Sequence, residues 1–289
     1  MEIHAHAKIN LFLRICGIRP DGYHELETLM CPIGLHDIVR LYFNAKNETD
    51  ISLDGRYLED VPAGKDNLAV IAAERFFEAA GIRGGVHIKL LKRIPPGAGL
   101  GGGSADAAAV LCGLNSHYDN YLPESRLMEI AAGIGADIPF FISGKPAIAT
   151  GIGEKLSFFP GLPFAHVVLV YPGVPVSTAR VYKNLKIKLT KNKISVKNFN
   201  FDLSGSKGIF PPYGGKWLYN DLESAAVEIC PAVLNAKKKI LSFNPDGASM
   251  TGSGSAVFGL FKDENAAVRA AESIRKIEKW SVFLTRLLV

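Results

Sequence analysis

Apolar and polar residues alternate over several short segments in the first half of the chain. Alternation at every second position is the period of a strand with one buried face. In the first of these segments Ile9, Leu11 and Leu13 fall on one face. Strands are predicted over residues 3–15, 38–43 and 86–91.

Other segments place apolar residues three and four positions apart, which is the period of an amphipathic helix. Asn67 can cap the first of these helices, and Gly81 ends it. A second helix is predicted to begin at Ser104, and a third to run from about Pro123 to Gly135. Because helices do not follow every strand in turn, the pattern favours an α+β fold over a doubly wound sheet.

The second half continues this mixture after a segment rich in chain breakers. Residues 155–163 are the best boundary between an N-terminal domain, residues 1–158, and a C-terminal domain, residues 159–289. Beyond the boundary, strands are predicted over residues 165–171, 255–261 and 282–287, and helices over residues 220–229, 232–240 and 264–277.

The composition is that of an ordinary globular protein, because 48% of the 289 residues are hydrophobic and 21% are charged. A net charge of +5 favours an anionic ligand without requiring nucleic acid. The four cysteines are scattered without C-x-x-C spacing, so neither a zinc site nor a disulfide framework is expected. Since no signal-peptide pattern or long apolar run is present, we expect a cytoplasmic protein with no membrane span.

The segment from Gly97 to Ser104 carries the clearest candidate chemistry. Five of its first seven residues are glycines. Without Cβ atoms, they let an anion approach the backbone amides, and the alanine-rich helix that follows adds free N–H groups and a positive dipole end. Loop and helix together form a candidate phosphate cradle.

Three interpretations of this loop compete with the phosphate cradle. No lysine follows the last glycine, so the loop is not a P-loop. Residues 97–102 fit G-x-G-x-x-G and Asp119 follows, but a dinucleotide fingerprint needs a strand directly before the first glycine, where Pro95 and Pro96 stand. A purely structural turn stays possible, although each glycine costs about 1 kcal/mol relative to alanine.

Three polar residues outside the loop could also carry chemistry. Lys8 and Asn10 lie two residues apart in a predicted strand, so they can offer a cation and an amide to one ligand, although a lysine there can also reach solvent. Asp137 precedes apolar residues and Pro139. Its carboxylate could act as a base or a magnesium ligand, or it could cap the next helix.

Several turns carry weaker signals. Asp21-Gly22 predicts a turn that presents Tyr23 and His24 as candidate contacts for a base or a sugar. The glycine clusters at residues 151–154 and 251–255 also stand out, and the second could approach a phosphate or form a tight hairpin turn.

Two basic features of the chain are ambiguous. His4 and His6 share a strand face, but no third metal ligand is evident, so exposure or packing is preferred to metal binding. Six lysines lie between residues 183 and 197. We expect this segment to be an exposed basic surface or loop.

The order of these segments resembles that of the GHMP small-molecule kinases, and the likeness spans nearly the whole chain. The glycine loop indicates the superfamily, whereas Lys8-Ile9-Asn10 and Asp21-Gly22-Tyr23-His24 indicate a member that acts on a cytidyl diphosphate. The matching segments are residues 7–13, 19–26, 95–105, 135–141, 151–154, 220–223 and 251–258.

The resemblance implies a two-domain fold, with an ATP-binding N-terminal domain, a ferredoxin-like C-terminal domain and the active site between them. It also implies the reaction, in which the γ-phosphoryl group of ATP goes to a hydroxyl group of a cytidyl-diphosphate sugar alcohol. We expect a monomer or weak homodimer that binds this small molecule, and neither nucleic acid nor a membrane.

The resemblance further implies roles for single residues. Asp137 takes the proton of the hydroxyl group, Lys8 steadies that hydroxyl and the transferred charge, and Ser104 and Asp137 lie near Mg²⁺. Substrate contacts are implied for Asn10, Tyr23, His24 and Tyr182. Asn67 lies near the adenine, and the other ATP contacts are Pro95, Pro96, Gly97, Ala98, Gly99, Leu100, Gly101, Gly102, Gly103, Ser104 and Ala105.

Two alternative functions stay open at this point. One is another kinase of the superfamily that acts on homoserine or mevalonate, for which Tyr23 and His24 would have no base to contact. The other is a nucleic-acid-binding protein that uses the lysines at 183–197 with Tyr182 and Phe199, although the net charge is modest for that role.

Overall fold

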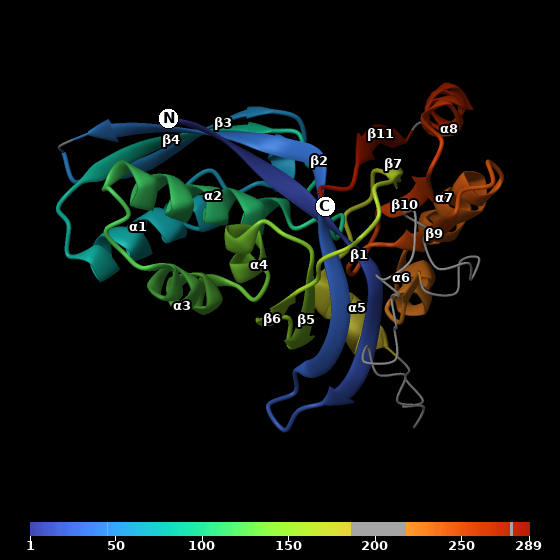
Figure 1. Ribbon diagram of the computed structural model, residues 1–289, viewed down its shortest axis with the longest axis horizontal. Coiled ribbons are helices and arrows are strands. Elements are labelled where there is room, and N and C mark those ends of the chain that lie inside the picture. The colour runs from blue at the N-terminus through green and yellow to red at the C-terminus, as the bar shows by residue number, and fades with distance from the viewer. Residues whose placement is uncertain (45, 186–217, 278–279) are drawn as a thin grey trace.

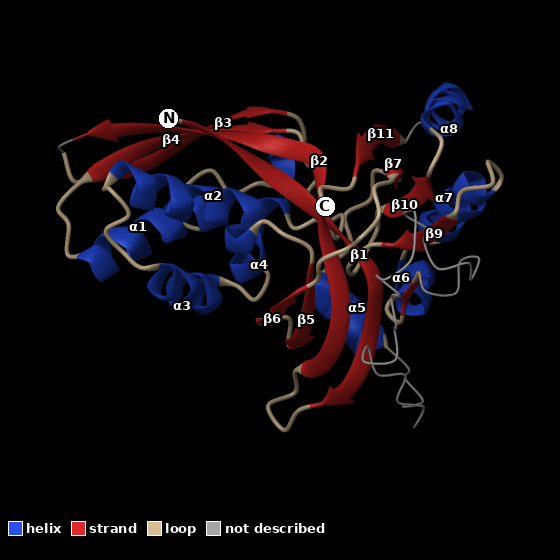
Figure 2. Ribbon diagram, viewed as in Figure 1, coloured by secondary structure: helices blue, strands red, loops and turns tan. Residues whose placement is uncertain are grey.

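The computed structural model describes residues 1–44, 46–185, 218–277 and 280–289. A large sheet lies over a layer of helices, and a second, smaller sheet with its own helices packs beside it (Figures 1 and 2). The separate sheets and the irregular order of strands and helices confirm the α+β prediction.

The large sheet has the order β3-β4-β2-β1-β8, and β5 and β6 extend it from β2. Its spine is the long antiparallel pair β1, Glu2–Ile18, and β2, His24–Asn44. The other strands are β3, Thr49–Gly55; β4, Gly85–Lys92; β5, Ala147–Gly151; β6, Lys155–Phe158; and β8, Tyr219–Asn220. Since β8 comes from the second half of the chain, this sheet joins both halves.

The strand predictions for the first half are confirmed at residues 3–15 and 86–91, whereas residues 38–43 are only the end of the much longer β2. The prediction of one buried face for β1 is wrong in its middle, because residues 7–13 are all buried. Ala7, Ile9 and Leu11 pack against the second sheet, while Lys8 and Asn10 lie on the opposite face in the cleft described below.

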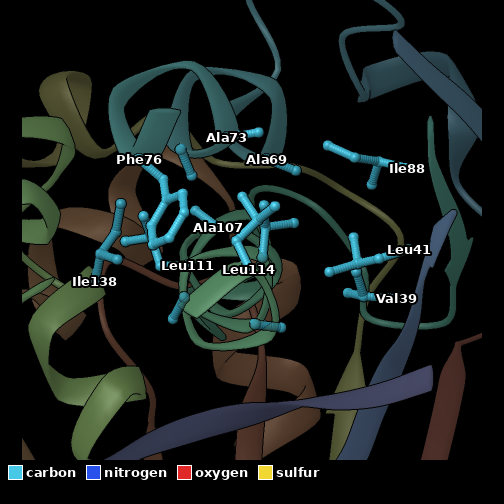
Figure 3. Close-up of a cluster of buried hydrophobic side chains, with 14 of the residues drawn as sticks. Val39, Leu41, Ala69, Ala73, Phe76, Ile88, Ala107, Leu111, Leu114 and Ile138 are labelled. Atoms are coloured by element: carbon cyan, nitrogen blue, oxygen red, sulfur yellow. The ribbon is translucent and has the colours of Figure 1, made fainter. Parts of the chain in front are cut away.

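Four helices cover one face of the large sheet: α1, Leu68–Ala80; α2, Gly102–His117; α3, Glu124–Ile134; and α4, Ile138–Ser143. Figure 3 shows Phe76 of α1, Leu111 of α2 and Ile138 of α4 converging in one apolar cluster. The cap predicted for α1 is present, because Asn67 Oδ1 accepts a hydrogen bond from the Ala69 amide at 2.9 Å. The second helix begins at Gly102, two residues before the predicted start.

The second sheet is antiparallel, with the order β11-β7-β10-β9. Its strands are β7, His166–Tyr171; β9, Gly247–Met250; β10, Val257–Phe261; and β11, Ser281–Arg286. The helices of this part are α5, Thr178–Asn184; α6, Glu223–Ile229; α7, Ala232–Leu241; and α8, Glu264–Ile277. The four antiparallel strands and their helices agree with the ferredoxin-like arrangement that the resemblance implies.

Alternate residues of β7 show how this sheet connects the two parts. Val168 and Val170 pack in the cluster with the helices of the second part, whereas Val167 and Leu169 pack in the cluster with β1. The two parts are also linked by a main-chain hydrogen bond from Leu288 to Pro32, at 2.9 Å. The predicted boundary falls between β6 and β7, but β8 crosses back to the first sheet, so the division at residues 158 and 159 stays a prediction.

Three further expectations concern single features. None of the helices in the described part of the chain has both the length and the apolar character that crossing a membrane requires. The four cysteines are unpaired, as their spacing predicts. Most of the lysine-rich segment, residues 186–217, lies outside the described residues.

Candidate functional site

A cavity of about 900 Å³ collects most of the residues that the sequence singled out. Its wall includes the glycine loop, the polar face of β1 and the Tyr23-His24 turn from the first half of the chain. The second half contributes Tyr182 of α5 and residues 252–253. The cleft is therefore built by both halves of the chain.

The glycine loop directs its carbonyls into the protein. Those of Gly97, Ala98, Gly99 and Leu100 accept hydrogen bonds of 3.0–3.2 Å from Val176 N, Ala256 N, Thr251 Oγ1 and Lys8 N. The amides of residues 99–104, by contrast, donate no hydrogen bond to any described residue. Backbone N–H groups are rarely left without a partner, so this row of amides at the start of α2 is suited to bind an anion.

Two glycines allow the loop to pack this closely. Gly99 and Gly101 adopt φ values of +76° and +71°, which are open to glycine but costly for other residues. A Cβ on Gly99 would lie 2.1 Å from the Thr251 carbonyl oxygen, and one on Gly101 would lie 2.6 Å from the Phe141 ring. The run of glycines therefore follows from close contacts as well as from turn geometry, so both the structural and the anion-binding interpretations have a physical basis.

Lys8 lies directly beside this loop. Its ammonium group is buried, donates to Asn10 Oδ1 at 2.6 Å and lies 3.8 Å from Asp137 Oδ2. Burial lowers the pKa of Lys8, and the charge of Asp137 opposes that shift. The alternative in which Lys8 extends to solvent is wrong, because only 5% of its side chain is exposed.

Asp137 immediately precedes α4, which is the position of a helix cap. Its side chain nevertheless makes no capping hydrogen bond. The carboxylate is 40% exposed and lines the cleft, close to the turn at Gly153. Asp137 is thus available to a ligand, and the capping alternative is not what the structure shows.

Asn10 is held on several sides. Its Oδ1 receives the Lys8 ammonium, its Nδ2 donates to Thr28 Oγ1 at 2.8 Å, and its backbone N–H donates to Thr251 Oγ1 at 3.0 Å. One N–H of its amide group is left for a ligand. Asn10 therefore positions Lys8, and its remaining N–H can contact a substrate.

The far end of the cleft is aromatic. The His24 ring lies 5.0 Å from the ring of Tyr182, centroid to centroid, and Tyr23 is exposed beside them. Burial, reinforced by the charge of Asp137, raises the pKa of Tyr182 to about 12, so its hydroxyl group stays neutral. Two segments more than 150 residues apart thus form one face suited to a planar ring.

The turn at residues 251–255 lines the cleft and is held in place by hydrogen bonds from β8. Asn220 Nδ2 donates to the carbonyls of Met250, at 2.9 Å, and Gly252, at 2.7 Å. Thr178 and Ser253 share a hydrogen bond of 2.8 Å between their hydroxyl groups. The segment at 220–223 therefore positions this turn.

Two predicted ATP contacts are not in the cleft wall. Asn67 is committed to capping α1 and donates to the Pro62 carbonyl at 2.7 Å, and Ala105 is buried in α2. Their contacts with ATP stay predictions. Thr28 and Thr178 line the cleft, but as isolated threonines in the sequence they carried no signal that could have found them.

No cluster of three or more His, Cys, Asp or Glu side chains with metal-binding geometry occurs among the described residues. His4 is exposed and stacks on His36, with centroids 4.2 Å apart, and His6 bonds the Ile33 carbonyl at 3.1 Å. His4 and His6 thus show the exposure and the packing that the sequence analysis preferred for them.

A buried group of three charges supports the start of the glycine loop. Lys92 donates to both Asp37 and Asp106, and Asp37 Oδ1 also accepts the backbone N–H groups of Arg93 and Ile94. Burial raises the pKa of Asp106 to about 7; the charge of Lys92 opposes the shift and that of Asp37 adds to it. The group joins β2, β4 and α2 just before Pro95.

The chain is similar to known proteins along its whole length. Residues 67–145 match the family model of the GHMP kinases N terminal domain, and residues 214–278 match that of the GHMP kinases C terminal domain. The chain is 43% identical to a 4-diphosphocytidyl-2-C-methyl-D-erythritol kinase of Syntrophotalea carbinolica, over 96% of each chain.

Two solved structures are also similar. A crystal structure of 4-(cytidine 5'-diphospho)-2C-methyl-D-erythritol kinase matches with a TM-score of 0.81 and 37% identity, over 100% of both chains. Homoserine kinase from Cytophaga hutchinsonii matches with a TM-score of 0.77 and 20% identity, over 100% of this chain and 94% of that one. The second likeness shows the shared fold alone.

The raised pKa of Asp106 predicts how stability depends on pH. The folded protein holds this proton more tightly than the unfolded chain, so the contribution is full below the ordinary pKa of 3.8 and is lost as pH rises through about 7. The Asp106→Asn variant keeps a neutral side chain of similar shape, so its free energy of unfolding should fall less between pH 4 and 8 than that of the wild type. Urea unfolding at several pH values measures this, with the exposed Asp66→Asn as control. Parallel pH profiles for wild type and Asp106→Asn would contradict the assignment.

Proposed function

The chain belongs to the GHMP kinase family, and from that premise we propose that its cleft transfers the terminal phosphoryl group of ATP to the 2-hydroxyl of 4-diphosphocytidyl-2-C-methyl-D-erythritol. This reaction belongs to the non-mevalonate route to isoprenoid precursors. The full-length similarity to kinases named for this substrate supports the proposal.

The single observation that carries the proposal is the row of free amides at residues 99–104 beside Lys8. Phosphoryl transfer depends mainly on alignment and on stabilisation of charge, rather than on covalent chemistry by the protein. Amides fixed in place by the buried carbonyls next to them can hold phosphate oxygens without further rearrangement. The loop contacts proposed for ATP are those of residues 95–104.

Asp137 and Lys8 are proposed as the catalytic pair. Asp137, which is partly exposed in the cleft, accepts the proton of the attacking hydroxyl group. Lys8 keeps its ammonium group near both Asp137 and the loop, and so stabilises the hydroxyl oxygen and the charge on the transferred group. Asn10 fixes the position of that ammonium group through the hydrogen bond to its side-chain oxygen.

Mg²⁺ is proposed to accompany ATP. Ser104 and Asp137 both line the cleft and offer one hydroxyl and one carboxylate oxygen, which fits an ion that takes few protein ligands and several phosphate oxygens. These two residues would hold the ion, and its charge would offset that of the phosphates.

The aromatic end of the cleft supports the choice of substrate. His24, Tyr23 and Tyr182 present rings for stacking against a planar base, and His24 can also form a hydrogen bond. A small acceptor such as homoserine or mevalonate has no ring to occupy this end. We therefore place the cytosine beside His24 and Tyr182.

We also propose a cellular compartment and an oligomeric state for the protein. The scattered, unpaired cysteines fit a reducing compartment, so we place the protein in the cytoplasm. We propose that it acts as a monomer or weak homodimer and does not use nucleic acid as a partner, because the net charge of +5 is small for that purpose.

Replacing Asp137 tests the proposed base. We expect Asp137→Asn to lower kcat by about 10²–10⁴-fold, because the amide cannot accept the hydroxyl proton, while ATP still binds. Steady-state kinetics and a nucleotide-binding titration measure the two effects. Asp66→Asn, an exposed aspartate outside the cleft, serves as the matched control, and near-normal turnover in Asp137→Asn would refute the assignment.

Replacing Gly101 tests the phosphate-binding loop. A side chain here would meet the Phe141 ring and require an unfavourable φ of +71°, so Gly101→Val should weaken ATP binding at least about tenfold. Isothermal titration with a non-hydrolysable ATP analogue gives the affinity. Gly133→Val is the matched control, because a Cβ on Gly133 has no atom within 4 Å. Unchanged affinity in a folded Gly101→Val protein would argue against the loop as the nucleotide site.

Replacing His24 tests the substrate end. His24→Ala should raise KM for the cytidyl-diphosphate substrate about tenfold or more and leave KM for ATP nearly unchanged, because His24 lies at the aromatic end. Turnover of the wild type on this substrate, homoserine and mevalonate is measured in parallel, and only the first is expected to react well. Equal changes in both KM values would indicate a structural role for His24. His87→Ala is the control, because His87 is partly exposed and does not line the cleft.

A further inference from the structure

A second cavity, of about 620 Å³, lies at the seam between the two parts of the molecule and shares no residue with the cleft. One wall carries Arg56 and Arg93, at the carboxyl ends of β3 and β4. The opposite wall comes from the end of the chain and carries Arg275 of α8, Trp280 and β11. Three guanidinium groups thus line one hollow.

The sheet register forces two of these arginines together. In the parallel pair β3 and β4, Gly55 lies opposite Lys92, so Arg56 and Arg93 follow as the next residues on neighbouring strands. The Arg56 backbone N–H donates to the Lys92 carbonyl at 2.9 Å, which fixes this arrangement. Two like charges placed side by side repel each other, and an anion bound between them offsets that repulsion.

The opposite wall is equally well defined. The Arg275 side chain donates through Nε and Nη2 to the Val282 carbonyl, at 3.1 and 2.9 Å, so its guanidinium group is anchored and still has N–H groups to offer. Tyr57, the residue after Arg56, donates from its hydroxyl group to Ser281 Oγ at 2.7 Å. This contact ties the two walls together, so the hollow is formed before any ligand binds.

The positive charge of this hollow is not neutralised from within. Among the described residues, no carboxylate lies within 4 Å of the guanidinium nitrogens of Arg56, Arg93 or Arg275, whereas other arginines such as Arg40 have such partners. Glu2 responds to the charge of Arg93 at longer range, but it pairs with Arg40 at 2.7 Å. An arginine cluster of this kind attracts an anion and can bind it through several charge-assisted hydrogen bonds.

We propose that this hollow, the arginine pocket, binds an organic diphosphate at a site separate from the catalytic cleft. Arginines on both walls offer paired N–H groups to two phosphoryl groups rather than one. The half-buried Trp280 supplies an apolar or stacking surface for the organic part of the ligand. The cavity volume lies within the range usual for small-molecule sites.

The chain offers a direct probe of this pocket, because Trp280 is one of only two tryptophans. In a Trp217→Phe background Trp280 is the single tryptophan, and its fluorescence reports ligand binding beside it. Inorganic pyrophosphate, titrated without metal, should produce a saturable change, and orthophosphate should bind at least tenfold more weakly. Since no turnover is measured, the outcome is independent of the kinase reaction proposed above.

Variants in this background locate the binding. Arg56→Gln combined with Arg93→Gln should weaken pyrophosphate binding at least tenfold, while the exposed Arg83→Gln, outside the pocket, should leave it unchanged. Thermal unfolding midpoints close to that of the background protein establish that each variant is folded, and Arg275→Gln supplies an independent variant from the other wall. An unresponsive Trp280, equal affinities for orthophosphate and pyrophosphate, or unaltered binding in both sets of pocket variants would overturn the proposal.

Discussion

The geometry of the proposed active site depends on the hydrogen bonds that the carbonyls of the glycine loop accept. Each carbonyl from Gly97 to Leu100 is bound by a donor from elsewhere in the fold, and three of the four donors lie in the second half of the chain. This leaves the following amides free and fixes where they point. The proposed binding site for phosphate is thereby assembled from both halves of the chain, because neither half supplies all the partners.

Two buried lysines have pKa values shifted in opposite directions because their neighbours differ. Lys92 is enclosed by two carboxylates, which outweigh its burial and raise its pKa. Lys8 has an amide oxygen at 2.6 Å and a single carboxylate at 3.8 Å, so burial prevails and its pKa is lowered. The ammonium group of Lys8 is consequently less satisfied within the protein and can interact strongly with a charged ligand, whereas Lys92 holds the loop in place.

The proposed catalytic cleft and the arginine pocket both lie where the two parts of the molecule meet. They contain different residues but are linked through one short segment, because Arg93 lines the pocket while its backbone N–H binds Asp37 just before the glycine loop. Where the two parts meet, strand ends and loops carry polar groups that have no hydrogen-bond partner within their own sheet. Hollows for ligands therefore arise where the two sheets adjoin.

The local sequence by itself determined those elements in which apolar residues recur regularly and capping or breaking residues mark both ends. Helix α1 has its Asn67 cap, its apolar stripe and Gly81, and the glycine loop stands out by its composition. Lys8, Asp137 and the Tyr23-His24 turn could also be identified as candidates, with the family resemblance supplying their roles. Only the tertiary structure decided that Asp137 does not cap α4 and that Tyr182 lies against His24. Strands such as β3 and β5, the burial of β1 on both faces and the pairing of Arg56 with Arg93 likewise escaped prediction, because each depends on contacts between residues far apart in the chain, for which local periodicity contains no information.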